Sequence, residues 1–101
     1  MELLERLRGC TGFQWDEGNA NKNWEKHRVT QTEAESIFFN QPLVVADDNI
    51  HSAVEERFFA LGHTNRARLL FVVFTVRRRK IRIISARDMT KKEREVYRLH
   101  G

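Results

Sequence analysis

The chain has 101 residues, of which 41% are apolar and 32% are charged, and its formal net charge is +4. This length allows one domain, and the apolar content excludes an intrinsically disordered chain. The single cysteine, Cys10, excludes a disulfide framework and a cysteine-rich zinc site. The longest apolar run, residues 69–74, is too short to cross a bilayer, so we expect a cytoplasmic protein with no membrane partner.

Local patterns predict an α+β domain built from one sheet and three helices. Alternation of apolar and polar residues predicts strands, and apolar spacings of three or four predict helices. In chain order, the expected elements are a strand at 13–15, helices at 17–27 and 30–39, strands at 43–46, 55–62, 69–76 and 81–85, and a helix from 90 to about 99. Short loops between the last four strands favour a twisted antiparallel sheet of about four main strands, with the most apolar strand at its centre.

Capping residues mark the beginnings of the three helices. The caps are Asp16, the capping box Thr30–Glu33 and the capping box Thr90–Glu93. In the first helix, Ala20, Trp24 and His27 share one face. Residues 1–12 precede these elements as an N-terminal arm, and residues 13–101 form the single domain.

The cationic residues are concentrated in the C-terminal third. Residues 1–64 contain six Lys/Arg and eleven Asp/Glu, a net charge of −5, whereas residues 65–101 contain twelve and three, a net charge of +9. This asymmetry favours a polyanionic partner, most often a nucleic acid. A basic surface that only keeps the protein soluble is the alternative on charge alone.

The last strand provides the first candidate site. A period of two places Lys80 and Arg82 on the outward face, and it places Ser85 and Arg87 in phase with the core-facing isoleucines, with Arg87 emerging where the strand ends. A guanidinium offers a rigid pair of donors to phosphate oxygens, so the arginines predict phosphate contact. The alternative is the charged outer face of an edge strand.

Other polar residues are candidates for proton transfer or binding. Histidine is the side chain that can give or take a proton near neutral pH, which makes His27, preceded by Lys26, a candidate, and a packed, hydrogen-bonded histidine is the alternative. The neighbours Glu56 and Arg57 form either a surface ion pair or part of a shared cleft. Tyr97 is either a hydrogen-bond donor to a ligand or a packing residue. The histidines show no metal-ligand spacing, and there is no Gly-rich phosphate loop.

Several motifs follow one another between residues 13 and 97. They are Phe13-Gln14-Trp15-Asp16, Lys26-His27, Asp48, His51, Glu55-Glu56-Arg57, Arg82-Ile83-Ile84-Ser85-Ala86-Arg87, Glu93-Arg94 and Tyr97. Together they resemble the BrnT family of type II toxins, the ribonuclease partner in BrnT/BrnA toxin–antitoxin modules. The resemblance implies a compact RelE-like fold and RNA cleavage that arrests growth. One departure is Arg28, where the family usually has glycine, and this position predicts a left-handed backbone.

The resemblance and the strand pattern together define the predicted site. The catalytic candidates are His27, Glu56, Arg82 and Arg87, and the RNA-binding candidates are Lys26, Arg57, Lys80, Ser85 and Tyr97. The expected reaction needs no metal and no other cofactor, because the 2′-hydroxyl of RNA is itself the nucleophile. His27 is the preferred acid–base residue, and Glu56 is the alternative base.

The resemblance also implies partners. The expected antitoxin is a BrnA-like ribbon-helix-helix protein. The toxin is therefore expected to reach operator DNA only indirectly, through the antitoxin, and a toxin homodimer within the complex is compatible with this arrangement. Two other hypotheses use the same basic surface without catalysis. One is a non-catalytic RNA-binding module, and the other is an antitoxin-docking module.

Overall fold

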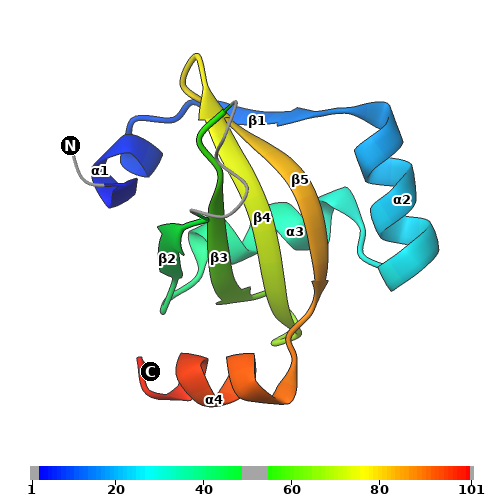
Figure 1. Cartoon of the computed structure of the whole chain (residues 1–101), viewed down its shortest axis with the longest axis vertical. Helices are drawn as coiled ribbons and strands as arrows, with labels where there is room; N and C mark the ends of the chain where they lie inside the picture. The colour runs from blue at the N-terminus through cyan, green and yellow to red at the C-terminus, as the bar shows by residue number, and fades with distance from the viewer. Residues whose placement is uncertain (1–2, 49–54, 101) are drawn as a thin grey trace.

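The computed structural model describes residues 3–48 and 55–100, and it contains four α-helices, one 3₁₀ helix and five strands in this part of the chain (Figure 1). In chain order they are α1 (Leu3–Arg8), β1 (Gly12–Trp15), α2 (Glu17–His27), α3 (Gln31–Ser36), η1 (Ile37–Phe39), β2 (Val44–Asp47), β3 (Phe58–His63), β4 (Leu69–Arg77), β5 (Lys80–Asp88) and α4 (Lys91–Arg98). The predicted α+β class is confirmed, and the bounds of α2 are those predicted.

The strands form one mixed sheet in the order β1-β5-β4-β3-β2. Strands β2 to β5 make the predicted antiparallel meander, with β4 at the centre. The sheet has a fifth strand, however, because β1 pairs with β5 in parallel, from Gly12 opposite Lys80 to Trp15 opposite Ile83. The prediction of an all-antiparallel sheet was therefore wrong in this detail, and β5 is not an edge strand. A four-residue strand gives no local indication of which distant strand it joins.

The three predicted helix caps are all present. The carboxylate of Asp16 accepts hydrogen bonds from the backbone of Gly18 and Asn19 at the start of α2. Thr30 and Thr90 each form a complete capping box at the start of α3 and α4. Because each cap satisfies backbone donors that would otherwise have no partner, the sequence specifies where these helices begin.

Helix α2 packs against the sheet through a polar residue. The predicted apolar face is wrong in part, because Trp24 is 47% exposed and Asn23 is the buried residue. The side-chain oxygen of Asn23 accepts a hydrogen bond from the backbone N–H of Ala86. Helix α2 therefore covers the edge of β5 beyond the end of β1. Trp24 is instead covered by the guanidinium of Arg28, 5.2 Å from its ring centre.

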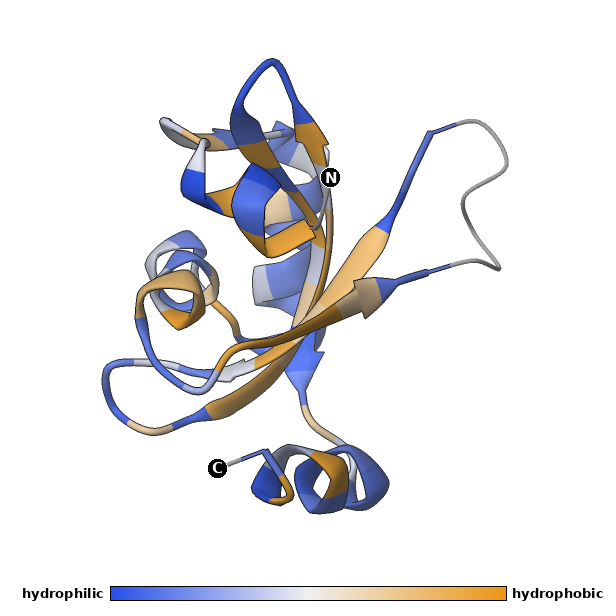
Figure 2. Ribbon diagram, turned by 90° about the vertical axis from the view of Figure 1, so that its left-hand side faces the viewer, coloured by the Kyte–Doolittle hydropathy of each residue, from blue (hydrophilic) through white to orange (hydrophobic). Residues whose placement is uncertain are grey.

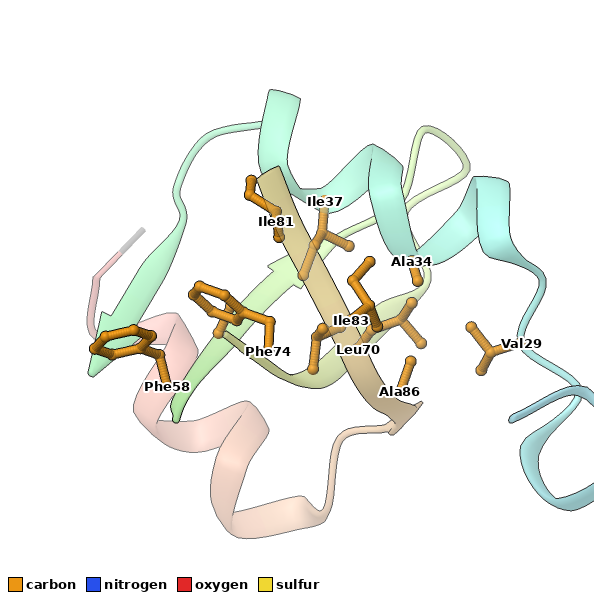
Figure 3. Close-up of a cluster of buried hydrophobic side chains, with 11 residues drawn as sticks. Val29, Ala34, Ile37, Phe58, Leu70, Phe74, Ile81, Ile83 and Ala86 are labelled. Atoms are coloured by element: carbon orange, nitrogen blue, oxygen red, sulfur yellow. The ribbon is translucent and has the colours of Figure 1, made fainter. Parts of the chain in front are cut away.

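The main core lies between α3, η1 and the inner face of the sheet (Figure 3). Its largest fully buried side chains are Phe74, Ile37, Leu70, Ile83, Val29 and Val72. A Cβ atom at Gly62 would lie 2.9 Å from Cβ of Ile37, so the close approach of η1 to β3 requires glycine there. Leu3 and Leu7 of α1 also pack against this core. The predicted arm is therefore seated on the domain.

The outer face of the sheet is covered at one end by α4. Leu61, Met89 and Tyr97 form a second buried cluster there. Figure 2 shows α4 at one end of the sheet, apart from the other helices, and largely hydrophilic in contrast to the apolar strands. Towards the other end, the outer-face side chains of Phe59, Val73 and Ile84 remain partly exposed. None of the helices described here is long and apolar enough to span a membrane.

Candidate nucleic-acid interface

A β-bulge in β5 determines which side chains share the outer face. Val73 pairs with Ser85 and Phe74 pairs with Ile83, so Ile84 is an extra residue in β5. Such a bulge shifts the alternation of all the residues that follow it. Ala86 is consequently buried in the core.

The bulge corrects one prediction about the site. Strict alternation placed Ser85 and Arg87 in phase with the core-facing isoleucines, which is wrong. Their partners, Val73 and Phe71, belong to the outer face of β4, and Ser85 and Arg87 therefore lie on the same face as Arg82. The predicted outward direction of Lys80 and Arg82 is confirmed, since they pair with Arg77 and Thr75 of that face.

A hollow of about 410 Å³ lies on this face. We call it the outer-face hollow, and its lining residues are Asp48, Arg57, Phe59, Phe71, Val73, Ile84 and Ser85. Arg82 and Arg87 lie on β5 to either side of Ser85. Their strand partners are four residues apart, which corresponds to about 13 Å along the strand. The strand positions of the two arginines thus flank the hollow, which Arg57 also lines.

Arg87 is held in a fixed orientation. Its two terminal nitrogens donate to the two carboxylate oxygens of Glu93 at 2.8 and 3.0 Å, and its guanidinium stands 4.1 Å from the ring centre of Phe71. Glu93 is itself fixed by the capping box of α4. The hydrogen bond from Arg87 outweighs burial and holds the pKa of Glu93 below its ordinary value.

Arg82 lies between two acidic groups at the opposite end of the hollow. Its guanidinium is 3.5 Å from the carboxylate of Asp16, the cap of α2. Glu55 accepts a hydrogen bond from Arg77, and this bond is the main cause of the lowered pKa of Glu55. Burial opposes the shift, and the positive charge of Arg82 adds to it. The arginines of this face are therefore positioned by neighbouring carboxylates.

His27 lies at the C-terminal end of α2, outside the lining of the hollow. Arg68 donates to the backbone carbonyls of His27 and Arg28 at 3.0 and 2.8 Å, and to the carboxylates of Glu33 and Asp88. The Arg68 hydrogen bond is the main cause of the lowered pKa of Asp88, and the charge of His27 contributes in the same direction. Arg68 thus joins the backbone at the C-terminal end of α2 to the carboxylate of Asp88, the residue that follows Arg87.

Glu56 lies at the other end of the sheet. Its side chain is 71% exposed, its carboxylate pairs with Arg6 of α1 at 3.5 Å, and its backbone carbonyl accepts a hydrogen bond from the Thr75 hydroxyl. Thr75 is five residues along β4 from Leu70, the partner of Asp88, a distance of roughly 17 Å. The structure therefore does not bring His27 and Glu56 together.

Three further predicted residues have simple placements. Lys26 is exposed on α2, and Lys80 is partly exposed at the start of β5. Tyr97 is 7% exposed and donates its hydroxyl to the carbonyl of Pro42 at 2.6 Å, so it packs α4 against the segment before β2. His51 lies outside the described residues. Within residues 3–48 and 55–100, no three His, Cys, Asp or Glu side chains converge as a metal site.

Sequence reasoning missed the aromatic part of this surface. Phe59 and Phe71 line the hollow, and their rings stack at 5.6 Å with an angle of 24° between the planes. The available signal was the alternation in β3, which puts Phe59 opposite in phase to the core residue Phe58. The neighbour relation between Phe59 and Phe71 depends on strand pairing, which the sequence did not show.

Comparison with known proteins identifies the family. Residues 15–93 match the family described as ribonuclease toxin, BrnT, of type II toxin-antitoxin systems. The chain belongs to the BrnT family. The crystal structure of the Brucella abortus ribonuclease toxin BrnT has a similar fold, with a TM-score of 0.61 and 20% sequence identity over 80% of this chain and 99% of that chain. Comparison with curated protein sequences gives no match. The suspected family is thus confirmed, and its type II systems pair each BrnT toxin with an antitoxin.

Proposed function

We propose that this BrnT-family chain is an endoribonuclease toxin that binds RNA across the outer face of its sheet and cleaves it without a metal ion. The observation that carries the proposal is the bulge at Ile84. This bulge aligns Ser85 and Arg87 with Arg82 beside the outer-face hollow, which Arg57 also lines. Three guanidiniums on one face suit a polyanionic strand, because each presents a fork of donors to phosphate oxygens.

The chemistry needs few protein groups. Attack of the 2′-oxygen on the adjacent phosphorus forms a new O–P bond and breaks the bond to the 5′-oxygen. The products are a 2′,3′-cyclic phosphate and a 5′-hydroxyl. The protein must accept the 2′-hydroxyl proton, stabilise the charge on the phosphorane and protonate the leaving oxygen.

We assign the electrostatic role to Arg82 and Arg87, with Arg57, Lys80 and Ser85 as further contacts. The strand positions of Arg82 and Arg87 are about 13 Å apart, which favours contact with different phosphates of one strand over contact with a single phosphate.

His27, with Lys26 beside it, remains our candidate for proton transfer. Arg68 joins its backbone carbonyl to the carboxylate of Asp88, so His27 lies at the same end of β5 as Arg87. Glu56 is the weaker candidate, because its carboxylate pairs with Arg6 at the other end of the sheet. A substrate strand that runs along β5 towards α2 contacts the arginines first and His27 next.

The cognate antitoxin is proposed to be a BrnA-like ribbon-helix-helix protein that covers the same face. A protein that occupies the outer-face hollow excludes RNA, and complementary acidic charge speeds its association. Operator DNA is then bound by the antitoxin, and the toxin reaches it only within the complex, as a monomer or as a homodimer. Competition between antitoxin and RNA for the purified toxin tests this arrangement.

The decisive test of cleavage uses matched RNA substrates. We expect the purified chain to cut single-stranded RNA in the presence of EDTA and to leave cyclic phosphate ends, and to stop when 2′-deoxynucleotides replace the ribonucleotides at the mapped cleavage sites. Induced expression should arrest growth, and co-expression of the antitoxin should restore it. Cleavage that continues at 2′-deoxy positions would refute the mechanism.

A non-catalytic RNA-binding or antitoxin-docking role is the second candidate. The separation of His27 from Glu56 favours it, because no pair of proton-transfer groups is assembled around the hollow. The two candidates differ in one result. A chain that binds RNA and releases no cyclic phosphate end under any condition supports the second.

A further inference from the structure

We propose that the outer-face hollow is a stacking site for an unpaired nucleobase, with the ring of Phe59, supported from behind by Phe71, as its aromatic platform, so that the substrate class is single-stranded RNA. This inference rests on the proposed function, and it adds a role that the arginines do not explain. Phosphate contact alone requires cations. It does not require apolar side chains that remain partly exposed between those cations.

One guanidinium and two aromatic rings form a row across three neighbouring strands. Arg87 of β5 stands over the ring of Phe71 of β4 at 4.1 Å, and Phe71 stacks with Phe59 of β3 at 5.6 Å. Both faces of the Phe71 ring are thus covered, one by a guanidinium that Glu93 fixes and the other by the ring of Phe59, so Phe59 is the ring on which a base stacks. Rings that are already ordered lose little conformational entropy when a base stacks on them.

The surroundings of the row match the chemistry of a nucleotide. Phe59, Phe71, Val73 and Ile84 provide a partly exposed apolar floor, and the hollow of about 410 Å³ above it exceeds the size of a single base. Arg57 and Ser85 provide polar groups on its wall, and Arg82 and Arg87 flank it. A flat apolar ligand joined to anionic groups on both sides is a base within a phosphodiester strand.

Single-stranded RNA follows from the same geometry. In a duplex, the faces of each base are covered by its neighbours and cannot stack on a protein ring. Aromatic stacking accepts every base, because each has a π-face, and it adds affinity to the electrostatic attraction of the backbone. The site therefore favours unpaired over paired RNA, with little dependence on base identity from stacking itself.

The test uses the full chain and an uncleavable probe. The probe is a short single-stranded 2′-O-methyl RNA in which 2-aminopurine replaces one base at a time. Stacking quenches the fluorescence of 2-aminopurine, and fluorescence anisotropy gives the affinity. The variants are Phe59→Leu, which removes the ring and keeps an apolar side chain, and Phe59→Tyr, which keeps the ring. Phe39→Leu is the matched control, because Phe39 is exposed and lies outside the hollow.

We expect the wild-type chain to quench the probe at one position or a few adjacent positions and to bind the single strand more tightly than its duplex. Phe59→Leu should weaken single-strand binding about 5- to 50-fold and remove the quenching. Phe59→Tyr and Phe39→Leu should behave as the wild type. Cleavage of the corresponding all-ribose RNA by Phe59→Leu should show a raised KM with a smaller change in kcat.

Several outcomes would overturn the proposal, and they separate it from the proposed function. If Phe59→Leu binds and quenches as the wild type does while RNA is still cut at ribose positions, the stacking site is wrong and the ribonuclease stands. If the wild-type chain neither binds nor cuts RNA, both fail. If Phe59→Leu weakens only antitoxin binding, the hollow is a protein-docking surface. Should Phe59→Leu not fold, photocrosslinking of wild-type chain to 5-iodouracil RNA decides, because crosslinks confined to residues outside the hollow contradict the proposal.

Discussion

The turn between β4 and β5 stores backbone strain that a double substitution should release. Arg78 and Arg79 form a two-residue hairpin loop, and their φ angles are 51° and 64°. A type I′ turn needs positive φ at both positions, which is why Asn-Gly is preferred there. Left-handed backbone costs a residue with a Cβ atom about 1–2 kcal/mol, so the two arginines together carry about 2–4 kcal/mol.

Replacing them by Arg78→Asn with Arg79→Gly removes most of that strain. Part of the gain is offset by about 0.5–1 kcal/mol for the greater chain entropy of glycine in the unfolded state. The lost hydrogen bond from Nε of Arg79 to the carbonyl of Gly9, 3.0 Å long, costs about 0.5–1 kcal/mol. A net stabilisation of about 1 kcal/mol remains, and for a chain of this size it raises the Tm by about 4–8 °C.

Thermal unfolding followed by circular dichroism measures this effect. The control is Arg66→Asn, which removes an exposed arginine from the turn between β3 and β4. The φ angle of Arg66 is not positive, so this substitution releases no backbone strain. The control should leave the Tm unchanged or slightly lower. A double variant that melts at or below the wild-type temperature would show that the turn is not strained as argued.

Three other substitutions test local parts of the structure. Arg28→Gly should unfold with a free energy about 0.5–1 kcal/mol higher than Arg28→Ala, because both variants lose the contact with Trp24 and only glycine adopts the φ of 54° at the end of α2 without strain, and equal values in urea denaturation would contradict this. Asn23→Ala should lower the free energy of unfolding by about 1–3 kcal/mol, since the buried N–H of Ala86 loses its acceptor, and proton exchange of that amide should accelerate. Glu93→Gln should reduce acid sensitivity. In the folded protein, the hydrogen bond from Arg87 lowers the pKa of the Glu93 carboxyl. The stabilisation from this pair is therefore complete above the ordinary pKa of glutamate and is lost as the pH falls through the lowered pKa. A Glu93→Gln variant whose stability has the same pH profile as the wild type would refute the pairing.

Features that depend on neighbouring residues were predictable from the sequence. The caps at Asp16, Thr30 and Thr90 were found because each is a contact within three residues of the chain. The left-handed backbone of Arg28 was also predicted, because the family resemblance led us to expect glycine there, which suits a left-handed helix ending. The central position of β4 followed from its apolar residues on both faces.

Features that depend on pairing were not predictable. The bulge at Ile84 has no local signal, and without it the alternation in β5 assigns Ser85 and Arg87 to the wrong face. The parallel partner of β1 was equally hidden. The predicted site residues were chosen as a series along the chain, and only the structure shows that His27 and Glu56 lie at opposite ends of the sheet.

The central claim is that the outer face of the sheet, rather than positive charge in general, acts on RNA. The most direct measurement compares the RNA cleavage rates of four single variants that each remove one arginine: Arg82→Gln, Arg87→Gln, Arg8→Gln and Arg66→Gln. Arg8 and Arg66 are exposed and lie outside the outer-face hollow. The account predicts a loss of about 10²-fold or more for Arg82 and Arg87 and little change for the other two. Equal, small losses in all four variants would contradict it.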